Sequence, residues 1–86
     1  MWFSGKIMPQ YEAKINILSA TAQYGLNVFE SIRAYWNDEE KILYAFRMNE
    51  HLDRLFQSCR LIRLSSSYQK NDIISFIKSL IKKNNF

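Results

Sequence analysis

Three polar side chains in the stretch from residue 50 to 62 could do chemistry because they recur at helical spacing. His51, Arg54 and Ser58 stand three and four positions apart, so on a helix they form one polar stripe. A guanidinium offers a planar set of donors that match phosphate oxygens, which a lysine cannot copy. A solvated face is the ordinary reason for such a stripe. The spacing alone leaves both interpretations open.

A second set of candidate residues lies in the stretch 28–36, which has the alternation of a β-strand. Phe29, Ser31 and Arg33 would project from one face, whereas Glu30 would point the other way with apolar neighbours. A phenyl ring beside an arginine is less typical of the solvent-exposed face of a sheet. An ordinary solvent-exposed face remains the alternative interpretation. The pattern singles out this face without assigning it a role, and Glu30 is interpreted as structural.

Other common kinds of site find no support in the sequence. Two glycines are too few for a glycine-rich phosphate loop, and one histidine with one cysteine cannot form a zinc site unaided. Cys59 falls on an apolar helical stripe and is interpreted as core rather than as a nucleophile. No serine has a recognisable triad context. No catalytic residue and no metal ligand are therefore predicted.

Length and composition indicate one globular domain. The chain has 86 residues, of which 48% are hydrophobic and 23% charged. The net charge of +4 invites a nucleic-acid role. However, the basic residues are scattered, and the one cluster stands where a helix C-terminus would favour positive charge. A nucleic-acid partner is therefore disfavoured.

The expected location is the cytoplasm. A single cysteine excludes an internal disulfide and suggests a reducing compartment. The N-terminus does not have the pattern of a signal peptide, and no apolar stretch has the length of a membrane span. We expect no membrane association.

The first half of the chain predicts two hairpins and a short helical turn. Trp2-Phe3 and Lys6 to Met8 would pair across a Ser4-Gly5 turn. Ser19 can cap a short helical turn through Gln23, and Gly25 then breaks it. The strand 28–36 would pair with 41–47 across a polar turn.

The second half predicts two amphipathic helices. Asn49 would cap the first, whose apolar stripe runs to Ile62, and Asn71 would cap the second, which ends near residues 84 and 85. The predicted fold class is α+β, an antiparallel sheet with two amphipathic helices packed on it.

Several motifs together resemble the fold-type-IV pyridoxal-phosphate aminotransferases, above all the branched-chain amino-acid aminotransferases. They are Trp2-Phe3-Ser4-Gly5, the run Tyr24-Gly25 to Ala34-Tyr35, Phe46-Arg47, and His-x-x-Arg-Leu at residues 51–55. The resemblance covers residue 2 to about residue 85. It implies that residues 1–86 are a single partial N-terminal domain, an incomplete version of the family's small domain.

The resemblance also implies roles for single residues. His-x-x-Arg supplies the arginine that holds the cofactor phosphate, which makes Arg54 the candidate, with His51 structural beside it. Tyr24 and Phe29 would contact the substrate side chain, and Arg33 would organise the pocket. Ser31 replaces the family's usual glycine, which predicts a slightly smaller and more polar pocket.

The family's cofactor-bearing lysine corresponds to none of the seven lysines of this chain. By resemblance, an intact enzyme would use pyridoxal phosphate to transfer an amino group between a branched-chain amino acid and 2-oxoglutarate. The chain alone is expected neither to transaminate nor to bind the cofactor tightly. Its expected partners are a missing C-terminal catalytic domain or a second chain, within a homo-oligomer. The alternative is a non-catalytic small-domain module that binds a partner protein.

Overall fold

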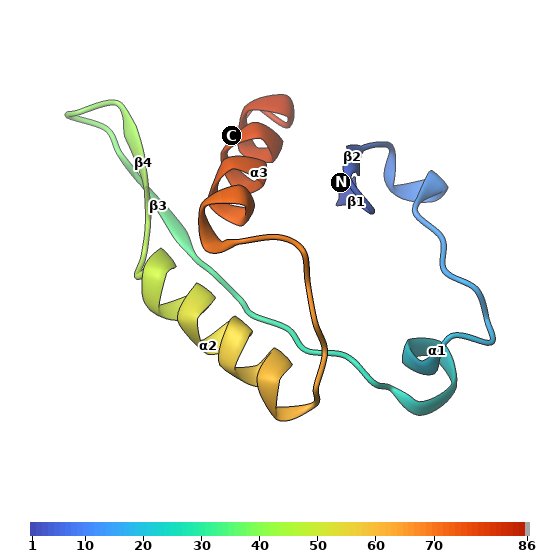
Figure 1. The fold of residues 1–86 in the computed structure, drawn as a ribbon. Helices are drawn as coiled ribbons and strands as arrows, with labels where there is room; N and C mark the ends of the chain where they lie inside the picture. The colour runs from blue at the N-terminus through green and yellow to red at the C-terminus, as the bar shows by residue number, and fades with distance from the viewer. Residues whose placement is uncertain (86) are drawn as a thin grey trace. The chain divides into compact units, whose positions relative to one another are not determined.

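A computed structural model describes residues 1–85, and Phe86, the last residue of the predicted domain, lies outside the described residues. The described chain forms two compact units. One contains Met1–Asn27 and the residues from Ser67 onward, and the other is Val28–Ser66. Each unit holds one two-stranded antiparallel sheet and one long helix (Figure 1). The predicted α+β class is confirmed, with the strands divided between two small sheets.

The first unit begins with the predicted hairpin. Strand β1 (Trp2–Phe3) pairs with β2 (Lys6–Ile7), and the turn residues Ser4 and Gly5 have φ angles of 50° and 91°. Positive φ at both turn residues matches the right-handed twist of a tight hairpin, and glycine adopts it at little cost. A 3₁₀ turn, η1, follows at Gln10–Glu12.

Helix α1 (Ala20–Tyr24) has the predicted cap Ser19 and the predicted terminating Gly25, and it runs one residue past the predicted end at Gln23. The Ser19 hydroxyl accepts a hydrogen bond from the Ala22 amide at 3.3 Å. Gly25 adopts the left-handed conformation with φ 64° and ψ 25°, which closes the helix. This short element places Tyr24 at its last position.

Helix α3 (Lys70–Lys83) completes the first unit, but its start differs from the prediction. Gln69 is the N-cap in place of Asn71. It forms a capping box in which its backbone amide donates a hydrogen bond to the Asp72 carboxylate at 2.8 Å. The reciprocal pair satisfies two amides that the helix leaves without partners, so the helix starts upstream of Asn71.

The second unit carries the longer hairpin and helix α2. Strand β3 (Ala34–Asn37) pairs with β4 (Ile42–Ala45), with Tyr35 opposite Tyr44. The predicted strand 28–36 is therefore too long at its start. Residues 28–33 have no regular ladder partner, yet their alternation persists: Val28, Glu30 and Ile32 are half-buried, and the residues between them are exposed.

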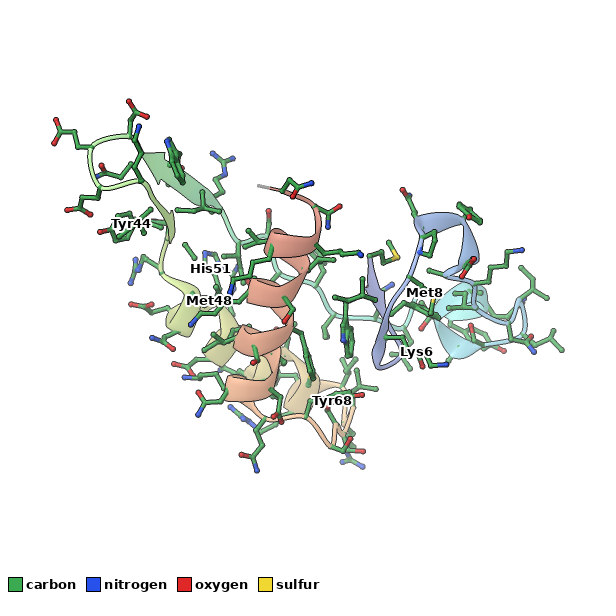
Figure 2. The ribbon with its side chains drawn as sticks, turned by 90° about the horizontal axis from the view of Figure 1, so that it is seen from above. Lys6, Met8, Tyr44, Met48, His51 and Tyr68 are labelled. Carbon is green, nitrogen blue, oxygen red and sulfur yellow. The ribbon has the colours of Figure 1, made fainter. Side chains whose placement is uncertain are left out.

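Helix α2 (Met48–Leu61) begins earlier than the predicted cap at Asn49. Its N-cap is Arg47, a left-handed residue with φ 53° and ψ 42°, whose carbonyl accepts from the His51 amide at 3.1 Å. One left-handed residue thus joins the end of β4 to the first turn of α2. Asn49 therefore falls inside the first turn. Tyr44 lies on β4, whereas Met48 and His51 lie at the start of α2 (Figure 2).

The apolar stripe of α2 supplies the most buried side chain. Leu52 is 1% exposed, and among the described residues it is the one hydrophobic side chain in the buried class. Cys59, predicted to belong to the core, is half-buried and free. Many large apolar side chains remain exposed, among them Leu61 at 79%. No helix in the described part of the chain combines the length and apolarity needed to cross a membrane.

Candidate functional site

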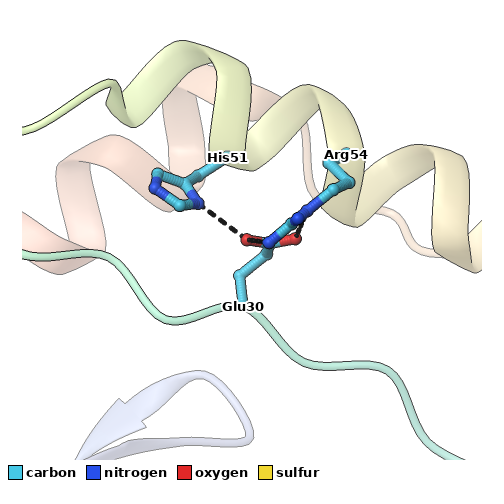
Figure 3. A network of polar contacts seen from close by, with 3 residues as sticks. All are labelled: Glu30, His51 and Arg54. Carbon is cyan, nitrogen blue, oxygen red and sulfur yellow. Dashed lines mark hydrogen bonds and ion pairs between the residues drawn. The ribbon is translucent and has the colours of Figure 1, made fainter.

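One acidic side chain binds two basic ones from α2 (Figure 3). Glu30 Oε1 accepts from Arg54 Nε at 2.5 Å, and Glu30 Oε2 accepts from Arg54 Nη2 at 2.8 Å. Oε2 also lies 2.8 Å from His51 Nδ1. A carboxylate and a guanidinium paired at two atoms each form a geometrically specific, charge-assisted contact. We call Glu30, His51 and Arg54 the α2 triad.

The elements explain how the triad meets. His51 and Arg54 are three residues apart on α2, so their side chains share one face of the helix. Glu30 comes from the extended segment before β3, on the half-buried side of its alternation. Its side chain is 5% exposed, compared with 23% for His51 and 67% for Arg54. The carboxylate is thus the enclosed member and the guanidinium the open one.

Glu30 lies on the side of its segment that the alternation predicts, whereas the sequence alone does not identify its partners. A signal was present, because Glu30 alternates with the apolar Val28 and Ile32. A carboxylate on such a face is rarely enclosed without a cation to compensate it. The polar stripe of His51 and Arg54 was the available source of that cation.

The triad shifts the acid–base properties of its members. Hydrogen bonds from Arg54, then from His51, lower the pKa of the Glu30 carboxyl from 4.5 to about 2. The same contact with Glu30 raises the pKa of the Arg54 guanidinium above its ordinary value. Both shifts favour the charged forms, so the pair stays ionised throughout the neutral range.

Acidification should therefore lower the free energy of unfolding as the Glu30 carboxylate becomes protonated. Because folding lowers this pKa, its stabilising contribution is complete above pH 4.5 and is lost as the pH falls towards about 2. We expect Glu30→Gln to unfold at lower urea concentration at neutral pH and to lose stability less steeply across this window. Urea unfolding followed by circular dichroism at several pH values measures both effects.

Glu39→Gln is the matched control, because it removes a carboxylate from the exposed turn between β3 and β4. It should keep the acid dependence of the native chain. Identical pH profiles for Glu30→Gln and the native chain would contradict a stabilising role for the triad carboxylate.

An open hollow of about 200 Å³ lies at the start of α2, lined by Arg47, Glu50, His51 and Arg54. We call it the α2 hollow. Arg47 Nε is 3.6 Å from Glu50 Oε1, and both side chains are largely exposed. Two guanidinium groups beside an imidazole form an environment suited to an oxyanion. Among residues 1–85 no group of three or more His, Cys, Asp and Glu side chains could hold a metal ion.

The predicted substrate residues divide between the two units. Phe29, Ser31 and Arg33 lie in the second unit, all on the exposed side of the segment that carries Glu30. Phe29 is 83% exposed. Tyr24 ends α1 in the first unit and is 86% exposed. The structure therefore brings His51 and Arg54 together, and it places three of the four substrate candidates along one side of one segment.

No family model matches this chain. It is, however, similar to curated proteins over nearly its whole length. It is 39% identical over 82 residues to a probable branched-chain-amino-acid aminotransferase of Aquifex aeolicus, and 34% identical over 85 residues to the branched-chain-amino-acid aminotransferase of Escherichia coli strain K12. The alignments cover 95% and 99% of this chain but 26% and 27% of the relatives.

A solved structure gives the same result. The branched-chain aminotransferase of Thermoproteus uzoniensis, crystallised with norvaline, matches with a TM-score of 0.87 and 38% identity, over 95% of this chain and 27% of that one. The chain thus spans about a quarter of the length of the relatives that it matches. Similarity of sequence and of structure agree, and this chain is similar to an N-terminal portion of the branched-chain aminotransferases.

Proposed function

We propose that this chain is a single partial N-terminal domain of a fold-type-IV aminotransferase that uses pyridoxal phosphate. The whole enzyme would transfer an amino group between a branched-chain amino acid and 2-oxoglutarate. The observation that carries the proposal is the α2 triad, which presents Arg54 at an open, basic hollow in a chain similar to branched-chain aminotransferases.

The residues at the hollow fit the phosphate group of the cofactor. A guanidinium has five N–H donors, and Glu30 takes Nε–H and one hydrogen of Nη2. The donors that remain on Nη1 and Nη2 form a planar pair of the kind that binds two phosphate oxygens. Arg54 would hold the phosphate there. When bound, pyridoxal phosphate acts as the electron sink for chemistry at the amino acid's α-carbon.

Substrate contacts would come from the exposed side chains already predicted. Tyr24 and Phe29 would contact the apolar side chain of the substrate, and Ser31 and Arg33 would contribute the polar part of the pocket wall. Support comes from exposure: rings 86% and 83% exposed have apolar surface available to a substrate or to another part of the protein.

The remaining catalytic domain, or a second chain that supplies it, is the proposed partner, within a cytoplasmic homo-oligomer. The relatives are about four times as long as this chain, which is consistent with such a partner. Exposed rings on the second unit, such as Tyr35 at 56% and Trp36 at 55%, offer apolar surface for it to cover.

A chimera tests the proposal. This chain would replace the matching quarter of the Aquifex aeolicus relative, and transamination of leucine, isoleucine and valine with 2-oxoglutarate would be assayed. We expect a folded protein that retains the cofactor and is active, while the relative lacking that quarter is inactive. A folded chimera that retains cofactor but does not transaminate would favour the non-catalytic binding module.

Substitution of Ser31 in the active chimera tests the pocket wall. Ser31→Gly removes a hydroxymethyl group and is expected to raise kcat/KM for leucine relative to valine by about tenfold, the low end of the range for one methylene in an apolar pocket. Asn37→Gly, at the last residue of β3, is the control and should leave the ratio unchanged. An unaltered preference in Ser31→Gly would contradict the assignment.

A further inference from the structure

The guanidinium of Arg54 has two edges, and one of them faces Glu30. Its Nε and Nη2 edge faces the Glu30 carboxylate, at 2.5 and 2.8 Å. Nη1 takes no part in this contact, and the side chain is 67% exposed. One edge is therefore fixed while the other can bind a ligand.

Glu30 is itself held from a second direction. Its Oε2 lies 2.8 Å from His51 Nδ1, so three donors from α2 converge on one carboxylate. Its side chain is 5% exposed, which leaves it little room to move. An exposed arginine normally loses rotamer freedom when it binds a ligand, and a fixed carboxylate behind it reduces that loss in advance.

We propose that Glu30 is a positioning residue for anion recognition, which fixes the guanidinium of Arg54 so that its Nη1 and Nη2 edge faces an oxyanion. His51 holds the carboxylate in that pose. The inference rests on the proposed function in one respect: Arg54 must be the residue that binds the phosphate. It goes further by assigning the enclosed acid, which no resemblance singled out, to the same task.

A charge effect and a positioning role predict opposite changes in anion affinity when Glu30 is neutralised, which makes the role testable. By charge alone, a carboxylate next to an anion site weakens binding, so neutralising it should tighten binding. If Glu30 positions Arg54, its replacement should weaken binding although a negative charge has been removed. Glu50 offers a matched comparison, since it lines the same hollow but contacts Arg47 only loosely, at 3.6 Å.

The experiment titrates the full 86-residue chain with inorganic phosphate and follows backbone amide and arginine Nε–H signals by NMR. We expect Glu30→Gln to weaken phosphate binding by about three- to tenfold, in line with the freedom regained by one long side chain. It should also remove the protection of the Arg54 Nε–H from solvent exchange. Glu50→Gln, with the same change of charge, should bind phosphate equally well or more tightly. Tighter or unchanged binding by Glu30→Gln would overturn the proposal.

Arg54→Lys separates failure of this inference from failure of the proposed function. Lysine keeps the charge but lacks the planar fork, so we expect weaker phosphate binding. In the Glu30→Gln background the same replacement should cost less, because the fork is no longer positioned. If Arg54→Lys and Arg54→Ala both bind phosphate as the native chain does, Arg54 is not the anchor. If they bind more weakly while Glu30→Gln does not, only the positioning role fails.

A folding defect in Glu30→Gln would be visible as collapsed amide dispersion, and Glu30→Asp then decides the question. Aspartate keeps the charge and retracts the carboxylate by one methylene, so it should still weaken phosphate binding. Native affinity in a folded Glu30→Asp would overturn the proposal.

Discussion

Replacing Arg54 by alanine in the chimera is expected to weaken pyridoxal phosphate binding by about 10- to 100-fold, the usual range for hydrogen bonds between charged partners. The change removes the proposed phosphate donors and leaves Glu30 enclosed with His51 as its remaining partner. Cofactor affinity is measured by titrating apo-protein and following the visible absorbance of the bound cofactor. Because the phosphate is remote from the reacting atoms, kcat at saturating cofactor should fall less than the affinity.

Arg60→Ala is the matched control for this substitution. Arg60 is an exposed arginine in the last turn of the same helix and does not line the α2 hollow. It should leave cofactor affinity within a factor of about two, as expected for a surface position. Equal losses in the two variants would show a general effect of positive charge on α2. An Arg54→Ala chimera with native affinity would remove Arg54 from the phosphate site.

The local elements followed from the sequence because their determinants lie close together along the chain. Ser19 and Gly25 bound α1 as predicted, since a hydroxyl cap and a left-handed glycine act within a few residues. The same holds for the hairpin between β3 and β4, where only a short polar turn separates the strands.

Element starts that depend on three-dimensional context were less predictable. Asn49 has good capping chemistry, yet the left-handed conformation of Arg47 on leaving β4 begins the helix two residues earlier. Likewise Gln69, and not Asn71, is the N-cap of α3, because its reciprocal hydrogen bonds with Asp72 satisfy two backbone amides. In both places the helix starts upstream of a residue with good capping chemistry, because the backbone conformation or a reciprocal pair of hydrogen bonds sets the start.

Within the candidate site, spacing identified His51 and Arg54 but could not identify what they bind. Their partner Glu30 is 21 and 24 residues away, and nothing in the local pattern fixes how its segment runs past α2. The segment 28–33 kept its alternation without becoming a strand, because alternation specifies which side is enclosed and not what encloses it. A helix, in place of a neighbouring strand, supplies the partners of Glu30.

Replacing Leu52 by alanine is expected to cause the largest loss of stability of any single substitution in the second unit. Leu52 is 1% exposed, and truncation of a buried leucine costs about 2–5 kcal/mol through lost burial and the cavity left behind. A chain of this size buries only about 60–65% of its unfolded surface, so its total stability is at the low end of the usual range. The loss should therefore unfold much of the population at 25 °C, as measured by urea unfolding with circular dichroism.

Leu61→Ala gives the comparison, since Leu61 is 79% exposed at the end of the same helix and should change stability by less than about 0.5 kcal/mol. Equal effects at Leu52 and Leu61 would mean that the apolar stripe of α2 is not what holds the unit together. Leu52 also lies close to the site, because it directly follows His51 and precedes Arg54 by two residues. If burial of Leu52 fixes the helix, then Leu52→Ala should also free the Arg54 Nε–H for solvent exchange, although Leu52 touches no anion itself.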